Sequence, residues 1–246
     1  MKANTVPASH GWLWIKQAFA LFKQSPLIWI ALCMAILLIG ALLGMIPLVG
    51  ILIFQLIAPV FTAGLILGCQ AQQQGKKLEI AYLFAGFKSH GAQLITVGGI
   101  YLTGMLIVAA IVSVTGGETL IQAMTAGRSD AQSIAASHIA TIGIMPIFLG
   151  LTLLLPLLMA YWFAPALVVF GNMSPVSAMK TSLFASLHNF APFLVYGLVI
   201  FGLFLLATVP FKLGLLVMIP LAFISYYTSF QDVFGNTEIK TATGSI

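Results

Sequence analysis

The sequence predicts an all-α, polytopic membrane protein that forms a single transmembrane domain. Of its 246 residues, 61% are hydrophobic and only 6% are charged. A soluble domain carries about 25% charged residues, because its surface faces water. The chain also contains six long apolar segments, and none of them includes an Asp, Glu, Lys, Arg or His residue. We therefore expect six transmembrane helices in a chain whose surface faces mostly lipid.

Six segments are long enough to cross a bilayer, since about 20 apolar residues in a helix span its hydrocarbon core. They are residues 27–46, 47–69, 92–114, 139–170, 191–210 and 213–230. Ser25 and Pro26 suit the start of the first one, because Ser caps a helix and Pro is tolerated in the first turn. The fourth segment is longer than the bilayer requires, so it should tilt, kink or protrude. The expected kink points are Pro146, Pro156 and Pro165.

One long polar stretch, residues 115–138, separates the third span from the fourth. Its first part predicts a short helix over residues 118–126 that ends at Gly127. Ser129 and Gln132 have the spacing of a capping box, which predicts the start of a second short helix.

Basic residues are distributed unequally between the two sides that six spans define. Eight of them would lie on the side of both termini, and two, Arg128 and Lys212, on the other side. Lys and Arg are enriched in cytoplasmic loops. We therefore expect both termini in the cytoplasm and the stretch 115–138 on the opposite side. In a bacterium this means the inner membrane, with the stretch in the periplasm.

A five-residue pattern, Phe-Ala-x-apolar-basic, occurs three times, each time before an odd-numbered span. It begins at Phe19, Phe84 and Phe184. Each copy ends an amphipathic segment whose apolar residues recur at helical spacing, which is typical of a helix lying in the cytoplasmic membrane interface. The apolar stripe of the first segment consists of Trp12, Ile15, Phe19 and Phe22.

The even-numbered spans share a proline, which is Pro59, Pro165 or Pro220. The pattern therefore predicts three pseudo-repeated pairs of transmembrane helices, each preceded by an interfacial helix. The units are residues 11–69, residues 78–171 with the periplasmic insertion 115–138, and residues 174–230, and residues 231–246 form a cytoplasmic tail. Gly40-x-x-x-Gly44 and Gly64-x-x-x-Gly68 are small-residue faces that allow close helix contact.

The sequence offers no recognisable catalytic or metal-binding pattern. Its carboxylates are scattered in predicted loops without a partner, and they are Glu79, Glu118, Asp130, Asp232 and Glu238. Cys33 and Cys69 have no histidine nearby. Intramembrane charges usually mark proton or ion pathways, and the predicted spans contain none. We expect a protein that is not an enzyme, holds no metal and no cofactor, and binds no nucleic acid.

Two sets of residues are candidates for a function. The first ends the three interfacial segments and consists of Lys23, Lys88 and His188. A cation there suits the helix C-terminus and meets lipid phosphates, so this set either only fixes the topology or forms a lipid-headgroup site. The second set consists of Pro59, Pro165 and Pro220. These prolines either only kink their helices or free backbone carbonyls that help line a cavity.

Several Trp, Pro and Gly residues carry a resemblance to a known group of proteins. They are Gly11 and Trp12 with Trp29, the pattern Ile46-Pro47-x-x-Gly50, and the pattern Ala58-Pro59-x-x-x-x-Gly64. With these features the chain resembles an uncharacterised family of proteobacterial six-helix inner-membrane proteins. That family is similar to the membrane domain fused to some glycerophosphodiester phosphodiesterases. The resemblance implies a six-helix inner-membrane fold without an established activity, and it carries over no catalytic residue.

Two functions fit these features. The first is a non-enzymatic inner-membrane protein that organises membrane lipids, or that scaffolds and stabilises a membrane protein partner or a homo-oligomer. The second is a transporter or carrier of an apolar or amphiphilic, lipid-like solute, which the prolines in the even-numbered spans favour. We favour the first, because the spans lack charge and the predicted cytoplasmic loops are compact.

Overall fold

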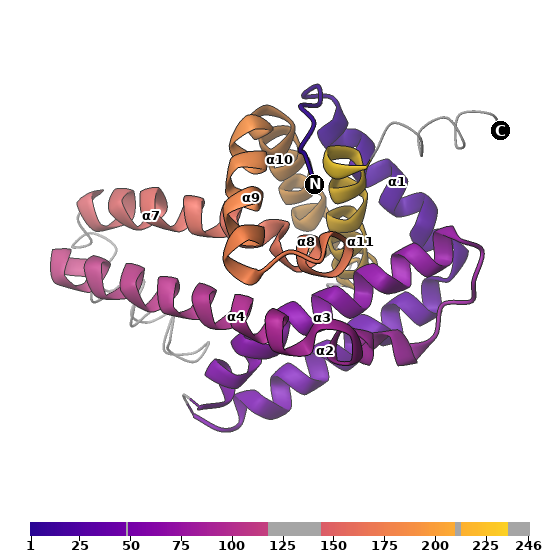
Figure 1. Cartoon of the computed structure of the whole chain (residues 1–246), viewed down its shortest axis with the longest axis horizontal. Coiled ribbons are helices and arrows are strands. Elements are labelled where there is room, and N and C mark those ends of the chain that lie inside the picture. Colours follow the sequence, from indigo (N-terminus) through magenta and orange to yellow (C-terminus); the bar gives the residue numbers. More distant parts are fainter. Residues whose placement is uncertain (48, 118–143, 210–212, 236–246) are drawn as a thin grey trace.

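The computed structural model describes residues 1–47, 49–117, 144–209 and 213–235 of the chain. Within these ranges all regular structure is helical, which confirms the predicted all-α class (Figure 1). The elements are α1 (His10–Gln24), α2 (Pro26–Gly44), α3 (Val49–Gln73), η1 (Ile80–Phe84), α4 (Ala85–Val112), η2 (Ser113–Gly117), α7 (Ile144–Trp162), α8 (Ala164–Gly171), α9 (Pro175–His188), α10 (Phe190–Thr208) and α11 (Leu215–Phe234). The two short helices predicted after residue 117 lie outside the described residues.

Five helical segments in the described residues are long and apolar enough to cross a membrane. They are Pro26–Gly44, Val49–Gln73, Ile80–Thr115, Met145–Gly171 and Phe190–Thr208. Each of them contains most of one of the first five predicted spans. The chain is therefore a helical membrane protein with five candidate spans.

Helix α11 corresponds to the sixth predicted span, but it extends beyond residue 230 to Phe234. Its first half is apolar, whereas its second half carries polar residues that lower the mean hydropathy. Most of these polar residues are buried inside the protein, and they include Ser225, Thr228, Ser229 and Asp232. Because polar side chains in α11 face protein, length and hydropathy alone do not mark it as a span, and the count of six stays a prediction.

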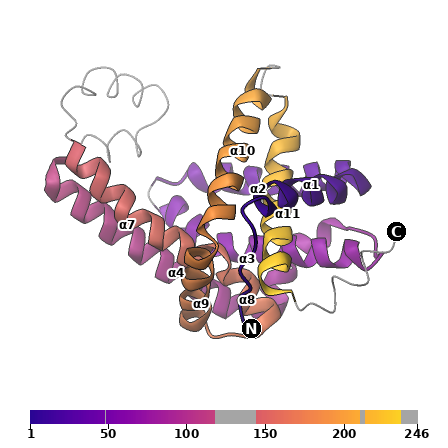
Figure 2. The ribbon, with the colours of Figure 1, turned by 90° about the horizontal axis from the view of Figure 1, so that it is seen from above.

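The long helices form three antiparallel pairs, which are α2–α3, α4–α7 and α10–α11. Figure 2 shows that the pairs α4–α7 and α10–α11 diverge from a common region in which α8 and α9 lie. As a consequence α7 and α10 hardly touch each other, although both pack against α9. Helix α1 packs across α10 and α11.

Three predicted interfacial segments end at a break in the helical backbone. The breaks lie at Ser25 (φ −150°, ψ 59°), at His90 (φ −138°, ψ 34°) and at Asn189 (φ −110°, ψ 31°). Pro26 explains the first break, because the residue before a proline is disfavoured in the α conformation. Gly91 follows the second break, where its flexibility eases the change of direction. Each of these segments therefore meets its long helix at an angle.

The long fourth predicted segment is interrupted, as its length suggested. Helix α7 ends at Trp162 and α8 begins at Ala164, with Pro165 in its first turn. The backbone groups at this break are satisfied from α9, because Phe163 N–H donates to Ser182 Oγ (2.8 Å) and Ser182 Oγ donates to Met159 O (2.6 Å). Pro156, another expected kink point, lies inside α7 without ending it.

Glycines allow α3 and the segment η1–α4 to approach closely. A Cβ atom added to Gly98 would lie 2.4 Å from Leu56 O, and one added to Gly64 would lie 2.4 Å from Tyr82 O. The predicted small-residue face at Gly64 therefore makes a close contact within the chain. In lipid the hydrophobic effect does not drive helices together, because lipid tails are as apolar as the helices. Close packing of this kind drives their association instead.

We expect Gly98→Ala to destabilise the folded protein by about 1–3 kcal/mol, because the added methyl group must push α3 away from α4. Gly99→Ala is the matched control, since its added Cβ would meet only Leu56 Cδ2 at an ordinary 3.7 Å. Unfolding titrations in mixed detergent micelles measure both changes. Equal stability of the two variants would contradict the close approach.

Candidate functional site

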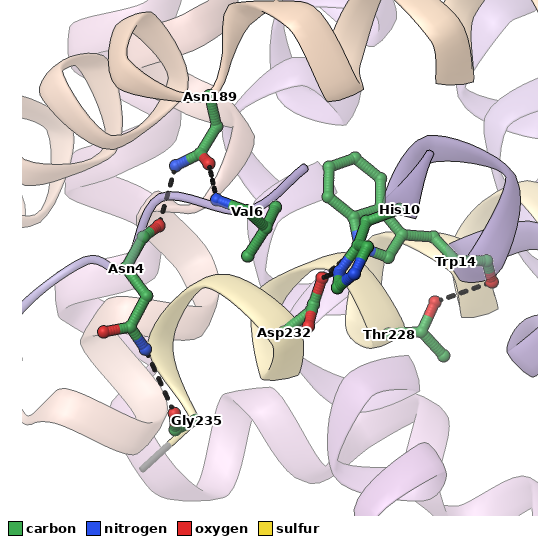
Figure 3. Close-up of polar contacts among 8 residues, drawn as sticks. All are labelled: Asn4, Val6, His10, Trp14, Asn189, Thr228, Asp232 and Gly235. Atoms are coloured by element: carbon green, nitrogen blue, oxygen red, sulfur yellow. Dashed lines mark hydrogen bonds and ion pairs between the residues drawn. The ribbon is translucent and has the colours of Figure 1, made fainter. Parts of the chain in front are cut away.

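A buried polar cluster joins the first helix to the last one. In this Asp232 cluster, His10 Nδ1 lies 2.6 Å from Asp232 Oδ2, and Trp14 Nε1 donates to the same oxygen at 2.9 Å (Figure 3). The side chain of Asp232 is 7% exposed and Trp14 is fully buried. Thr228, one turn earlier in α11, donates to Trp14 O at 2.9 Å. These bonds hold α1 across the C-terminal half of α11.

The extended N-terminal segment continues this polar contact. Asn4 N–H donates to Val233 O (2.8 Å), and Val6 N–H donates to the Oδ1 atom of Asn189 (2.9 Å). Asn189 Nδ2 donates to Asn4 O (3.0 Å), so one buried amide pairs with both a backbone N–H and a backbone C=O group of the segment (Figure 3). The N-terminus is thereby held between the end of α11 and the junction of α9 with α10.

The Asp232 cluster corrects the prediction that the carboxylates lie in loops without a partner. Asp232 belongs to the last turn of α11, within the segment 231–246 that the sequence assigned to a tail. The spacing of His10 and Trp14, four residues apart on one helix face, was the available signal. No group of three or more His, Cys, Asp or Glu side chains in the described ranges could hold a metal ion.

A second feature is an apolar groove between α7, α9 and α10, which we call the α7–α10 groove. Its volume is about 380 Å³. It is lined by Leu155, Leu158, Met159, Trp162, Ser186, Phe190, Phe193, Leu194, Gly197 and Leu198. Several of these apolar side chains are strongly exposed, with Leu198 at 66% and Leu194 at 52%. The groove lies where the pairs α4–α7 and α10–α11 begin to diverge.

Trp162, the last residue of α7, lines this groove. Its ring packs against Phe193 (centroids 5.6 Å apart), Tyr196 (5.9 Å) and Tyr226 (5.8 Å). Its Nε1 atom is buried and has no acceptor among the described residues. A buried donor without a partner costs about 1–3 kcal/mol. The aromatic packing therefore fixes the ring although its polar atom is not satisfied.

The structure leaves the three predicted headgroup residues on the surface, each at the end of its own segment. Lys23 and His188 lie in the last turns of α1 and α9, and Lys88 precedes the break in α4. His188 Nδ1 lies 2.7 Å from Phe184 O, and because a carbonyl only accepts, this nitrogen carries the proton. The three residues belong to three different helices, and no hydrogen bond joins any two of them within the described ranges.

The three predicted prolines are buried in helices. Pro59 and Pro220 lie inside the continuous helices α3 and α11, and Pro165 lies in the first turn of α8. Pro220 borders a gap of about 10 Å³ beside Cys33, which is no larger than one water molecule. None of the three lines the α7–α10 groove.

The predicted apolar stripe of α1 is divided between two faces. Ile15 and Phe22 are buried, whereas Trp12 and Phe19 are 48% and 44% exposed. Apolar residues cover much of α1, and packing on α10 and α11 selects the inner ones. The outer face alternates aromatic and basic side chains at helical spacing, and we call it the α1 stripe: Trp12, Lys16, Phe19 and Lys23. Lys23 Nζ lies 5.2 Å from the centroid of the Phe19 ring.

The chain is similar to a probable inner membrane protein of Burkholderia thailandensis. The two are 29% identical over 260 aligned positions, which cover 97% of this chain and 96% of the relative. No family model and no solved structure matches the chain. Together with the five candidate spans, this similarity supports an uncharacterised kind of inner-membrane protein. The kinship with membrane domains of glycerophosphodiester phosphodiesterases stays a prediction.

Sequence reasoning missed the α7–α10 groove. Its walls come from residues 155–162 and 190–198, which belong to two different helix pairs. The apolar pattern of α7 and α10 is the same as that of any lipid-exposed helix, so it gives no sign of the angle between the pairs. Trp162 beside a predicted helix break was the one signal that set this place apart.

We expect Trp14→Phe to destabilise the protein by about 1.5–3 kcal/mol, because the carboxylate of Asp232 loses a hydrogen bond. The N-terminal segment should also become sensitive to proteases. Trp12→Phe is the matched control on the exposed face and should change stability by less than about 0.5 kcal/mol. Detergent unfolding titrations with limited proteolysis measure both. Intact protection of residues 1–9 in Trp14→Phe would contradict the role of the cluster.

Proposed function

We propose that this protein is a non-enzymatic, multi-pass inner-membrane protein that organises anionic lipid at the cytoplasmic face. The observation that carries the proposal is the α1 stripe, in which exposed aromatic and basic side chains alternate along one helix face. Trp is enriched where the membrane meets water, and Lys extends its charge from an apolar surface toward phosphates. Each Lys near an anionic membrane contributes about 1 kcal/mol of attraction.

The proposed topology places both termini in the cytoplasm, with α11 as a sixth span. It is supported by the position of the lysines, since Lys16, Lys23, Lys88 and Lys180 all lie on segments that flank the long helices. In this topology α1, η1 and α9 lie along the cytoplasmic interface. The diverging ends of the pairs then point toward the opposite side of the membrane.

The three units predicted from the sequence belong to this proposal as well. Their support is the recurrence of one arrangement, in which a short helix, a backbone break and a long apolar helix follow one another. The breaks at Ser25, His90 and Asn189 come five or six residues after Phe19, Phe84 and Phe184, respectively. A threefold use of one unit would repeat exposed aromatic side chains along the interface, because Phe84 and Phe184 are 49% and 59% exposed.

The scaffolding role and the carrier role remain alternatives with less support. A partner protein or a second copy would be held by lipid-facing surfaces such as those of α2 and α10, where Leu38 and Leu198 are exposed. A carrier of a lipid-like solute is favoured by the α7–α10 groove. Flux of a labelled lipid across proteoliposomes separates a carrier from a protein that only holds lipid.

We expect the double variant Lys16→Glu, Lys23→Glu to retain at least about 30-fold less anionic lipid than the wild type, because two attractive charges of about 1 kcal/mol each are lost and become repulsive. The measurement is mass spectrometry of lipids that stay bound after extraction into native nanodiscs. The matched control is Lys76→Glu, Lys77→Glu, which makes the same change of charge in the loop after α3. An equal loss in both variants would indicate unspecific attraction and contradict a role of the stripe.

A further inference from the structure

We propose that the α7–α10 groove binds one acyl chain of a glycerophospholipid from the cytoplasmic leaflet, with the headgroup at the end of the groove where α9 meets α10. This inference rests on the proposed lipid-organising function. It adds the groove as a second lipid-binding site, which holds an acyl chain. Its support is the shape, the chemistry and the surroundings of the groove.

The shape fits a single chain. The walls run from Leu155 to Trp162 on α7 and from Phe190 to Leu198 on α10. At 1.5 Å per residue these stretches are about 10–12 Å long, close to the roughly 15 Å that one leaflet of a 30 Å hydrocarbon core provides. The volume of about 380 Å³ lies at the lower end of the range for small-molecule sites. A transmembrane helix, about 10 Å wide with its side chains, requires a longer and wider face.

The chemistry of the walls selects an apolar occupant. All but one of the wall side chains are apolar or aromatic, and the exception, Ser186, already lies 3.4 Å from Met159 O as a donor. A polar ligand placed there would lose its hydrogen bonds to water without replacement. The walls of α7 and α10 also belong to candidate spans, so the molecules that surround the groove are lipids.

The polar end of the groove has a defined direction. Helix α7 ends at Trp162 and α10 begins at Phe190, so both walls end on the same side, where α9 lies. His188, the last residue of α9, is exposed at this end. It comes two positions after the wall residue Ser186 and so lies on another face of the helix, outside the groove wall. Its Nδ1 is bound to the carbonyl of Phe184, which leaves Nε2 on the outer edge of the ring. A lipid whose chain follows the groove therefore has its phosphate at the end of the groove beside the C-terminus of α9, where His188 lies.

Gly197 makes the groove testable. A Cβ atom added at this position of the groove wall meets no atom within 4 Å, so a larger side chain there would fill the groove without pushing the backbone. Gly202, on the same helix, is equally open but does not line the groove. The pair Gly197→Phe and Gly202→Phe therefore blocks the groove in one case and leaves it open in the other.

The experiment uses the full chain in nanodiscs of phosphatidylethanolamine and phosphatidylglycerol, doped with phosphatidylglycerol that carries a diazirine in one acyl chain. After irradiation, peptide mass spectrometry should place the label on residues 155–162 and 190–198 more strongly than on the exposed face of α2 around Leu38. Gly197→Phe should lower this labelling about tenfold, the factor lost when roughly two methylene groups leave an apolar site. Gly202→Phe should not change it.

Two outcomes would overturn the inference. Labelling of the groove equal to that of the α2 face in the wild type would show ordinary surrounding lipid, and this result needs no variant. Cross-links from the groove to another polypeptide or to a second copy would show a protein occupant. The Lys16→Glu, Lys23→Glu protein separates the two proposals, because it should keep its groove labelling. Loss of anionic lipid in this variant with groove labelling above that of the α2 face supports both proposals. Loss of anionic lipid with groove labelling no stronger than that of the α2 face supports the stripe alone, and strong groove labelling without loss of anionic lipid supports the groove alone.

Discussion

The pairing of the Asp232 carboxylate with Trp14 and His10 is the interaction on which the arrangement of the other helices depends. Burying a carboxylate is costly, and the contacts with His10 and Trp14 offset part of this cost, so α11 is more stable in its position when α1 lies across it. The same principle acts with neutral groups at Gln72, which accepts from Trp29 and donates to Leu21 O, both at 3.0 Å. Directed polar contacts therefore hold the ends of the helix pairs, and the apolar parts of the pairs are free to diverge.

Local properties of the chain were the ones that the sequence could predict. The first five candidate spans follow from the length of apolar runs, and the break at Ser25 follows from the proline after it. The pairing of Asp232 with His10 could not be predicted, because the two residues are more than 200 positions apart in the sequence. A single carboxylate also does not indicate which residue binds it. Likewise, hydrophobic periodicity showed that α1 is amphipathic, but only packing decides that Phe22 faces inward and Phe19 outward.

The candidate site divides in the same way. Lys23, Lys88 and His188 were predicted to be exposed ends of helices, since charge and position along the chain suffice for that. The groove could not be predicted, because it is a property of the angle between two helix pairs. In the proposed function both features bind phospholipid. The α1 stripe binds its phosphate, and the groove binds its hydrocarbon chain.

The hold on the N-terminal segment has a consequence for the order in which the chain acquires its structure. Asn4 and Val6 bond to Asn189 and Val233, and Asn4 also bonds to Gly235 at 3.3 Å. Residues 4 and 6 are translated well before their partners at 189, 233 and 235, and contacts over such separations form slowly. The helix pairs can insert one after another, but α1 completes its contacts only when α11 has emerged. A chain that stops before α11 lacks the Asp232 acceptor for Trp14 Nε1, and only the packing of Trp14 on Phe193 and Tyr196 of α10 then holds this part of α1.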